Sequence, residues 1–205
     1  METYKNIIET AFQNAENNDS KLTPFLIYMD SNIGNKIKYF YNNIYNTDSK
    51  YLDIASINGN YLSYGIYGNQ SNIVSIYDWL GFRLSRNIMD QMDNYKGNNN
   101  LTIIQNYFDK VDISNWRNTF NMIMLDDSSK INHYEIIEYF YNCLDDIFVL
   151  VISNWDLLQV RNATMYTFKQ LNLKILYKKE IISYYLDDNE KENWKKGVCA
   201  FIIQK

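Results

Sequence analysis

The sequence predicts an open, doubly wound α/β fold, in which a mostly parallel sheet carries helices on both faces. Short apolar runs recur along the chain, and amphipathic stretches of helical length separate them. Apolar runs of about four to six residues are typical of strands buried on both faces, as in a parallel sheet. Their alternation with helices implies right-handed crossovers, which place helices on both faces of the sheet.

Two helices are expected before the first strand, over residues 3–16 and 36–45, because both segments place apolar residues at helical spacing. The first apolar face holds Tyr4, Ile7, Ile8, Ala11 and Phe12, and the second holds Ile37, Phe40, Tyr41 and Ile44. Pro24 lies in the loop between them, and the stretch 17–24 is too short to separate domains. We therefore expect one domain, residues 1–205, with N-terminal helices in 1–46 and an α/β core in 50–205.

The remaining elements follow the alternation. Strands are expected at 51–55, 73–77, 101–104, 122–125 and 147–152. Helices are expected at 61–67, 80–92, 134–144 and 157–171. The tail, 173–185 and 197–204, predicts two longer strands that form a terminal antiparallel hairpin. We expect the strand that starts at Tyr51 to lie near the centre of the sheet.

The composition excludes several classes of protein. The formal net charge is −4 and no long basic run occurs, which argues against a nucleic-acid groove. No run reaches the length of a membrane span, and the N-terminus has no apolar leader, so we expect no membrane partner and a cytoplasmic location. Cys143 and Cys199 cannot form a metal site alone, and a disulfide framework is not expected. The nineteen tyrosines indicate either a bias toward AT-rich codons or a sugar-binding surface.

In such sheets, ligands bind beyond the carboxyl ends of the strands. The first strand ends in Asp53, followed by small residues and Gly59. Small residues at this position let the backbone approach a ligand closely. A tight turn between strand and helix would account for the same residues equally well. The second ends in Tyr77, Asp78 and Trp79, where an acid suits ribose hydroxyls and an aromatic ring suits a flat ligand. A helix-capping aspartate with a buried tryptophan is the alternative.

The other strand ends are polar as well. Asn106 and Phe108 follow the third strand and suit the amino group and ring of an adenine. Asp126 follows the fourth strand, and Ser153 and Asn154 follow the fifth. Five such strand ends together predict a ligand pocket more strongly than any one of them.

The order of these segments resembles the class I S-adenosylmethionine (SAM)-dependent methyltransferases, a Rossmann-like superfamily, over about residues 30–183. The resembling group has an Asp-Asp-Trp motif after its fifth strand. The resemblance rests on the order and spacing of four segments more than on any one motif. They are Tyr51-Leu52-Asp53-Ile54-Ala55-Ser56-Ile57-Asn58-Gly59, Ser75-Ile76-Tyr77-Asp78-Trp79, Leu125-Asp126-Asp127 and Val151-Ile152-Ser153-Asn154-Trp155.

The resemblance implies SAM as the cofactor and assigns roles at the strand ends. Asp53 and Gly59 would line its methionine part, with Ala55 at the position of the first motif glycine. Tyr77 would occupy the position of the usual ribose acid. The other implied cofactor contacts are Asp78, Trp79, Asn106 and Phe108. Asp126 would be catalytic, as the acid that serves a metal or the substrate.

The sequence departs from the pattern of that group at the metal-binding positions. Ser153 and Asn154 replace paired acids, and Asp127 and Ser129 stand where the group has Gly and His. A divalent cation prefers several hard oxygen ligands that include carboxylates. The sequence therefore names no metal ligand and argues against metal dependence.

Two further side chains are candidates for chemistry. His133, seven residues beyond Asp126, is a candidate general base, and the alternative is a partly exposed polar residue at a helix start. Arg161 could pair with a ligand carboxylate, or form a structural ion pair.

The sequence thus favours a SAM-dependent methyltransferase that acts on a small molecule or glycan. A catalytically inactive binding module that keeps the fold is the alternative. A nucleotide-sugar or dinucleotide enzyme fits less well, because the chain has no Gly-x-Gly-x-x-Gly stretch.

Overall fold

The sheet contains seven strands in the order β3-β2-β1-β4-β5-β7-β6. The computed structural model describes residues 1–205 except 29–30, 46–48, 55–59, 78–96, 98 and 126–131. The strands are β1 (Lys50–Ile54), β2 (Asn72–Tyr77), β3 (Asn100–Gln105), β4 (Phe120–Leu125), β5 (Leu144–Ser153), β6 (Lys174–Ile181) and β7 (Val198–Gln204).

The sheet is mostly parallel, as the sequence predicts. β1 to β5 pair in parallel, with β1 between β2 and β4 in the interior. β7 runs antiparallel to both of its neighbours, β5 and β6. The expected antiparallel pairing of the two tail strands is therefore confirmed, and so is the position of β1 near the centre of the sheet.

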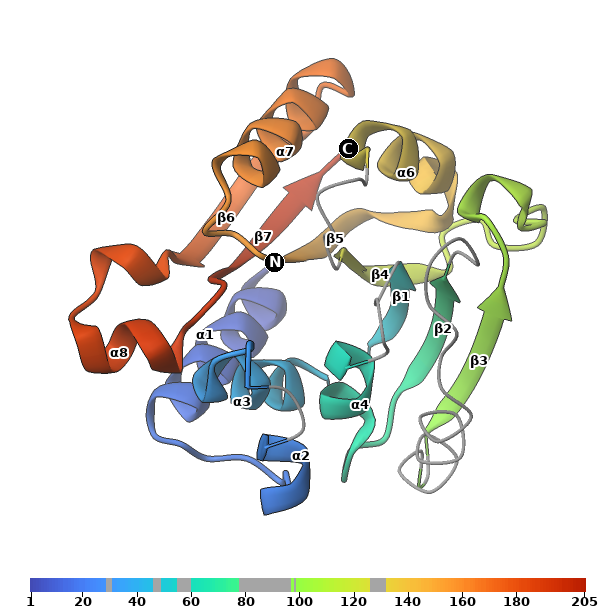
Figure 1. The fold of residues 1–205 in the computed structure, drawn as a ribbon. Helices are drawn as coiled ribbons and strands as arrows, with labels where there is room; N and C mark the ends of the chain where they lie inside the picture. The colour runs from blue at the N-terminus through green and yellow to red at the C-terminus, as the bar shows by residue number, and fades with distance from the viewer. Residues whose placement is uncertain (29–30, 46–48, 55–59, 78–96, 98, 126–131) are drawn as a thin grey trace.

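Helices cover both faces of the sheet (Figure 1). On one face lie α1 (Glu2–Glu16), α3 (Asn35–Ile44) and α4 (Asn60–Ile66), and on the other lie α6 (His133–Phe140) and α7 (Leu158–Gln170). The strands bury alternate side chains against each layer, so that Tyr51 belongs to the first core and Leu52 to the second. No helix among the described residues is long and apolar enough to cross a bilayer.

Three elements differ from the sequence-based expectations. Pro24 does not lie in a loop but starts a short helix, α2 (Pro24–Tyr28), because proline suits the first position of a helix, where its missing N–H is not needed. The helix expected over 134–144 ends earlier, at Phe140, and a 3₁₀ turn leads into β5 at Leu144. The strand expected over 173–185 ends at Ile181. The helix expected at 80–92 lies outside the described residues.

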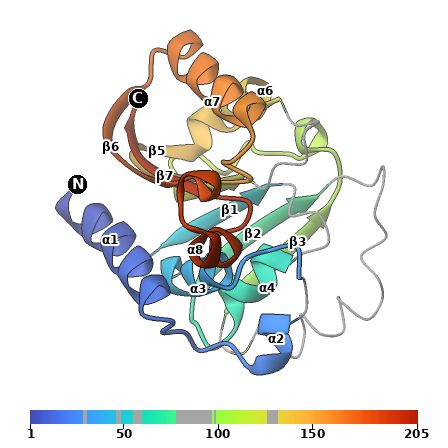
Figure 2. The ribbon, with the colours of Figure 1, turned by 60° about the vertical axis from the view of Figure 1, so that its left-hand side comes forward.

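Residues 182–197 connect β6 to β7 at the carboxyl end of β5. This connection starts beside Ser153, because Ile181 and Ser153 both pair with Val198, and it contains the 3₁₀ turn Ser183–Tyr185 and helix α8 (Asp188–Asn193). We call this segment the β6–β7 cap. Figure 2 shows α8 lying beside α3.

Polar contacts fix the β6–β7 cap to the N-terminal helices. Lys36 of α3 is almost fully buried and bonds to Glu16 of α1 at 2.5 Å and to Glu190 of α8 at 2.6 Å. The amide of Gly34 donates to the carbonyl of Lys195 at 3.3 Å. These contacts hold the β6–β7 cap against α1 and α3.

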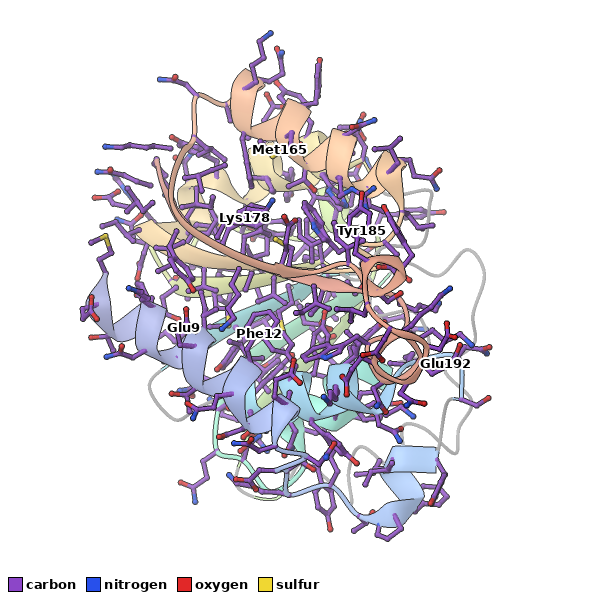
Figure 3. The ribbon with its side chains drawn as sticks, turned by 90° about the vertical axis from the view of Figure 1, so that its left-hand side faces the viewer. Glu9, Phe12, Met165, Lys178, Tyr185 and Glu192 are labelled. Atoms are coloured by element: carbon purple, nitrogen blue, oxygen red, sulfur yellow. The ribbon has the colours of Figure 1, made fainter. Side chains whose placement is uncertain are left out.

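The edge strand β6 lies between the two helical layers. In Figure 3, Glu9 and Phe12 of α1 lie on one side of the strand that carries Lys178, and Met165 of α7 lies on the other. Lys179 forms an ion pair with Glu9, and its ammonium group lies 5.1 Å from the ring centre of Phe12. Lysines on this edge disfavour pairing with another chain.

Candidate functional site

The carboxyl ends of four parallel strands meet at one edge of the sheet. Ile54 at the end of β1 pairs with Ile76 of β2 and with Leu125 of β4, and Leu125 pairs with Ile152 of β5. This is the edge at which open α/β sheets bind their ligands. We therefore take it as the candidate site.

Asp53 is the one acid that an interior strand carries into this edge among the described residues. Its side chain is 1% exposed, and the hydroxyl of Ser75 on β2 donates a hydrogen bond of 2.6 Å to its Oδ2 atom. Burial raises the pKa of Asp53 to about 7, against the smaller lowering effect of the Ser75 bond. The carboxyl group is therefore poised to ionise when a cation comes close.

Tyr45 lies near this carboxyl group. Its ring stacks on that of Tyr51 at 4.3 Å. Its buried hydroxyl finds no hydrogen-bond partner within the described part of the chain. Burial, and then the charge of Asp53, hold the pKa of Tyr45 well above its usual value.

Asn106 and Phe108 follow β3 at the same edge, as the sequence predicts. Asn106 accepts a bond from the amide of Tyr107 at 2.9 Å and donates one to the carbonyl of Lys110 at 3.5 Å. The ring of Phe108 packs edge-on against Tyr139 of α6, with 5.9 Å between ring centres. Both side chains thus have structural contacts, and their contact with adenine stays a prediction.

His133 is the first residue of α6, and it is buried, with 1% exposure. The alternative of a partly exposed polar histidine is therefore wrong. Its Nδ1 atom lies 3.0 Å from the hydroxyl of Thr164 on α7. Burial lowers the pKa of His133 to about 4, so the imidazole is neutral at physiological pH.

Arg161 has a structural role at this edge. Its guanidinium group donates to the carbonyls of Trp155 at 2.7 Å and Asp156 at 2.9 Å, and to the hydroxyl of Tyr184 at 2.6 Å. The partners of Arg161 are thus two backbone carbonyls and a hydroxyl, not a carboxylate of the protein. Through these bonds Arg161 links the start of α7 to the β6–β7 cap.

The end of β5 carries two uncharged polar side chains, Ser153 and Asn154. Ser153 is fully buried, and the side-chain amide of Asn154 donates to its hydroxyl at 3.3 Å. Asn154 has a φ of +53°, a conformation that asparagine tolerates better than most residues. Across the described ranges, no three His, Cys, Asp or Glu side chains gather closely enough to hold a metal ion.

Several predicted site residues lie outside the described residues, namely Ala55, Gly59, Asp78, Trp79 and Asp126. Tyr77 ends β2, in register with Gln105. Sequence patterns alone do not single out Ser75 or Thr164. The available signal for Ser75 is a serine inside the run 73–77, whose other residues are aliphatic or aromatic. That Ser75 faces Asp53 depends on the register of two strands. Thr164 gives no signal, because it meets His133 only through helix packing.

No protein-family model matches the sequence, and no curated protein matches it. Solved structures do match. A Streptococcus mutans protein assigned as a SAM-dependent methyltransferase superimposes with a TM-score of 0.55 at 14% identity, over 83% of this chain and 48% of that one. A SAM-dependent methyltransferase from Aquifex aeolicus gives 0.55 at 11% identity, over 78% and 84%. The [4+2]-cyclase SpnF gives 0.55 at 9% identity, over 83% and 80%.

These likenesses establish the fold. The chain has the Rossmann-like fold of the class I SAM-dependent methyltransferases, and it spans about half the length of the Streptococcus mutans protein. At such low identities a shared fold does not transfer an activity, since one fold hosts many reactions.

Proposed function

We propose that this chain binds SAM at the carboxyl edge of its sheet and transfers the methyl group to a small-molecule or glycan acceptor. The observation that carries the proposal is Asp53, a buried carboxyl group at the end of an interior strand that accepts a hydrogen bond from Ser75. Its position matches the acid that the resemblance assigns to the methionine part of SAM.

The chemistry of Asp53 suits that ligand. A buried carboxylate is costly unless a cation or several donors compensate it. With a pKa of about 7, Asp53 can ionise at physiological pH and pair with an ammonium group such as that of the methionine part. A divalent metal fits less well, because Ser153 and Asn154 lack charge and bond to each other.

Methyl transfer from a sulfonium is an in-line displacement, so the protein mainly aligns two bound reactants. His133 takes the proton that the methylated group of the substrate loses. Its imidazole is neutral and lies at the start of α6, the helix that follows β4. The catalytic role predicted for Asp126 stays a prediction.

The acceptor class follows from composition. A formal charge of −4 without a clustered basic run disfavours a nucleic-acid acceptor, so we propose that the acceptor is a small molecule or a glycan. We also propose that the chain is a single domain and acts in the cytoplasm.

The second candidate function is a binding module that keeps the fold without turnover. The end of β5 favours it, since Ser153 and Asn154 stand where the resembling group has paired acids. The likeness to a cyclase also fits the view that this fold serves more than methyl transfer.

Calorimetry with SAM and S-adenosylhomocysteine tests the proposal. We expect both to bind, and Asp53→Asn to weaken the binding by about tenfold or more, as expected for a lost charged hydrogen bond. Asp109→Asn is the control, because that carboxylate is half-exposed and pairs only loosely with Lys110 at 3.4 Å.

If neither ligand binds to the parent protein, the proposal is excluded. Binding without turnover on a broad panel of hydroxyl and amine acceptors would favour the binding module.

A further inference from the structure

The hydroxyl of Thr164 has its hydrogen already engaged. Thr164 is fully buried on α7, and its Oγ1 donates to the carbonyl of Val160, one turn earlier, at 2.9 Å. A threonine hydroxyl has a single hydrogen but two lone pairs. Toward the Nδ1 atom of His133, 3.0 Å away, it can therefore act only as an acceptor.

This geometry fixes the tautomer of His133. Nδ1 must carry the proton that Thr164 accepts, and a neutral imidazole has one proton, so Nε2 is left with a bare lone pair. The imidazole is neutral because its burial disfavours the charged form. The helix start adds to this, since the positive end of the α6 dipole disfavours a cation there.

The bare Nε2 atom is buried and accepts no hydrogen bond from the residues that the structure describes. Leaving a buried acceptor unpaired destabilises the protein, and most buried polar groups in proteins are paired. A ligand that brings an O–H or N–H group would remove this cost.

The location suits such a ligand. α6 follows β4 and α7 follows β5, and these strands are parallel neighbours in the sheet. Both helices therefore start at the carboxyl edge, the same edge to which Asp53 belongs. His133 is the first residue of α6, so its side chain stands at the start of the α6–α7 layer.

We propose that Thr164 is a positioning residue that holds His133 with its proton on Nδ1, so that Nε2 takes the proton of the methyl acceptor. This rests on the proposed function. In the step, a lone pair of the acceptor oxygen or nitrogen forms the bond to the methyl carbon. The carbon–sulfur bond of the sulfonium breaks, and its electron pair stays on sulfur. The proton that the acceptor loses passes to Nε2 and then to water.

The tautomer can be measured directly, because His133 is the only histidine of the chain. Imidazole ¹⁵N NMR then shows one pair of ring nitrogens. We expect the parent protein to show a protonated Nδ1 and an unprotonated Nε2. Thr164→Val keeps the shape but removes the acceptor, so the proton should move partly or wholly to Nε2. Thr164→Ser keeps the hydroxyl and should preserve the parent pattern.

Circular dichroism establishes that each variant is folded. A protonated Nε2 in the parent protein, or an unchanged pattern in a folded Thr164→Val variant, would overturn the positioning role. If Thr164→Val does not fold, the parent spectrum and Thr164→Ser decide the matter alone.

A second measurement tests whether Nε2 faces the reaction. SAM and S-adenosylhomocysteine differ in the methyl group and the charge on sulfur, so an Nε2 atom close to the reacting centre should resonate differently in the two complexes. Identical Nε2 resonances in both saturated complexes would overturn the role of His133. Failure of both ligands to bind would instead remove the proposed function, and the tautomer result would stand separately.

Discussion

The hydroxyl of Ser75 donates a hydrogen bond of 2.6 Å to Oδ2 of Asp53 across the neighbouring strands β2 and β1. The two residues are directly paired in the register of these strands, and both are buried. The bond favours the ionised carboxylate, whereas burial favours the protonated form. The balance between these two effects places the pKa of Asp53 near neutrality.

Replacing Ser75 should shift that balance. In Ser75→Ala the carboxylate loses its donor, so the pKa of Asp53 should rise further above 7, and S-adenosylhomocysteine should bind more weakly at pH 7. NMR titration of the Asp53 carboxyl carbon and calorimetry measure the two effects. Ser114→Ala, at an exposed serine, should change neither. An unchanged or lowered pKa in Ser75→Ala would contradict the assigned hydrogen bond.

Ligand affinity should depend on pH through Asp53. If an ammonium group pairs with the ionised carboxylate, the ionised fraction sets the apparent affinity. With a pKa of about 7, that fraction rises roughly eightfold between pH 6 and pH 7.5, and the affinity for S-adenosylhomocysteine should rise by the same factor. Asp53→Asn should show a flat profile over this range. Equal pH dependence in the two proteins would rule out Asp53 as the responsive group.

Stability should respond to pH through two buried groups that act in opposite directions. The unfolded imidazole of His133 takes up a proton below about pH 6.5, but the folded one does so only near pH 4. Falling pH therefore favours unfolding in this window, by up to about 3 kcal/mol. Asp53 keeps its proton up to about pH 7 when folded but loses it above about pH 4 when unfolded, so rising pH favours unfolding.

Denaturant unfolding of single variants separates the two effects. Relative to the parent protein, Asp53→Asn should gain stability as the pH rises from 4 to 7. His133→Gln should instead gain relative stability as the pH falls from 6.5 to 4. A difference from the parent that does not vary with pH, in either variant, would show that the group is not buried as described.

Gly34 should tolerate no side chain. Its φ of −64° suits any residue, but a Cβ atom there would lie 2.2 Å from the carbonyl oxygen of Asn193. Gly34→Ala should therefore push α3 away from the β6–β7 cap and cost about 3 kcal/mol, as severe overpacking does. Thermal unfolding measures the loss, with exposed Ser31→Ala as the control. A melting temperature equal to that of the parent would contradict the close contact.

The sheet could be predicted from the sequence because its interior strands are buried on both faces. Met122–Leu125 of β4 and Ile147–Ile152 of β5 are continuous apolar runs, and runs of this length are typical of strands in a parallel sheet. α8 could not be predicted. It has no buried residue, and it depends on the capping bond that the Asp187 side chain accepts from the amide of Glu190 and on the ion pair of Glu190 with Lys36.

The candidate site could be predicted only in part. Asp53 stands out in the sequence because a charged residue at the end of an apolar strand is unusual. Its partner Ser75 and the pair His133–Thr164 could not be predicted, because each contact depends on the register of two strands or the packing of two helices. Sequence spacing fixes neither.

The reversed strand β7 has a consequence for the order in which the protein folds. β5 and β6 both pair with β7, although β7 follows both of them in the chain. Until residues 198–204 insert, the apolar edge of β5 and the whole of β6 lack their partners, so a late intermediate exposes an open strand edge. Such edges are where partly folded chains associate with one another. Mutations that weaken β7 should therefore lower the yield of refolding at high protein concentration, even where the folded protein keeps most of its stability.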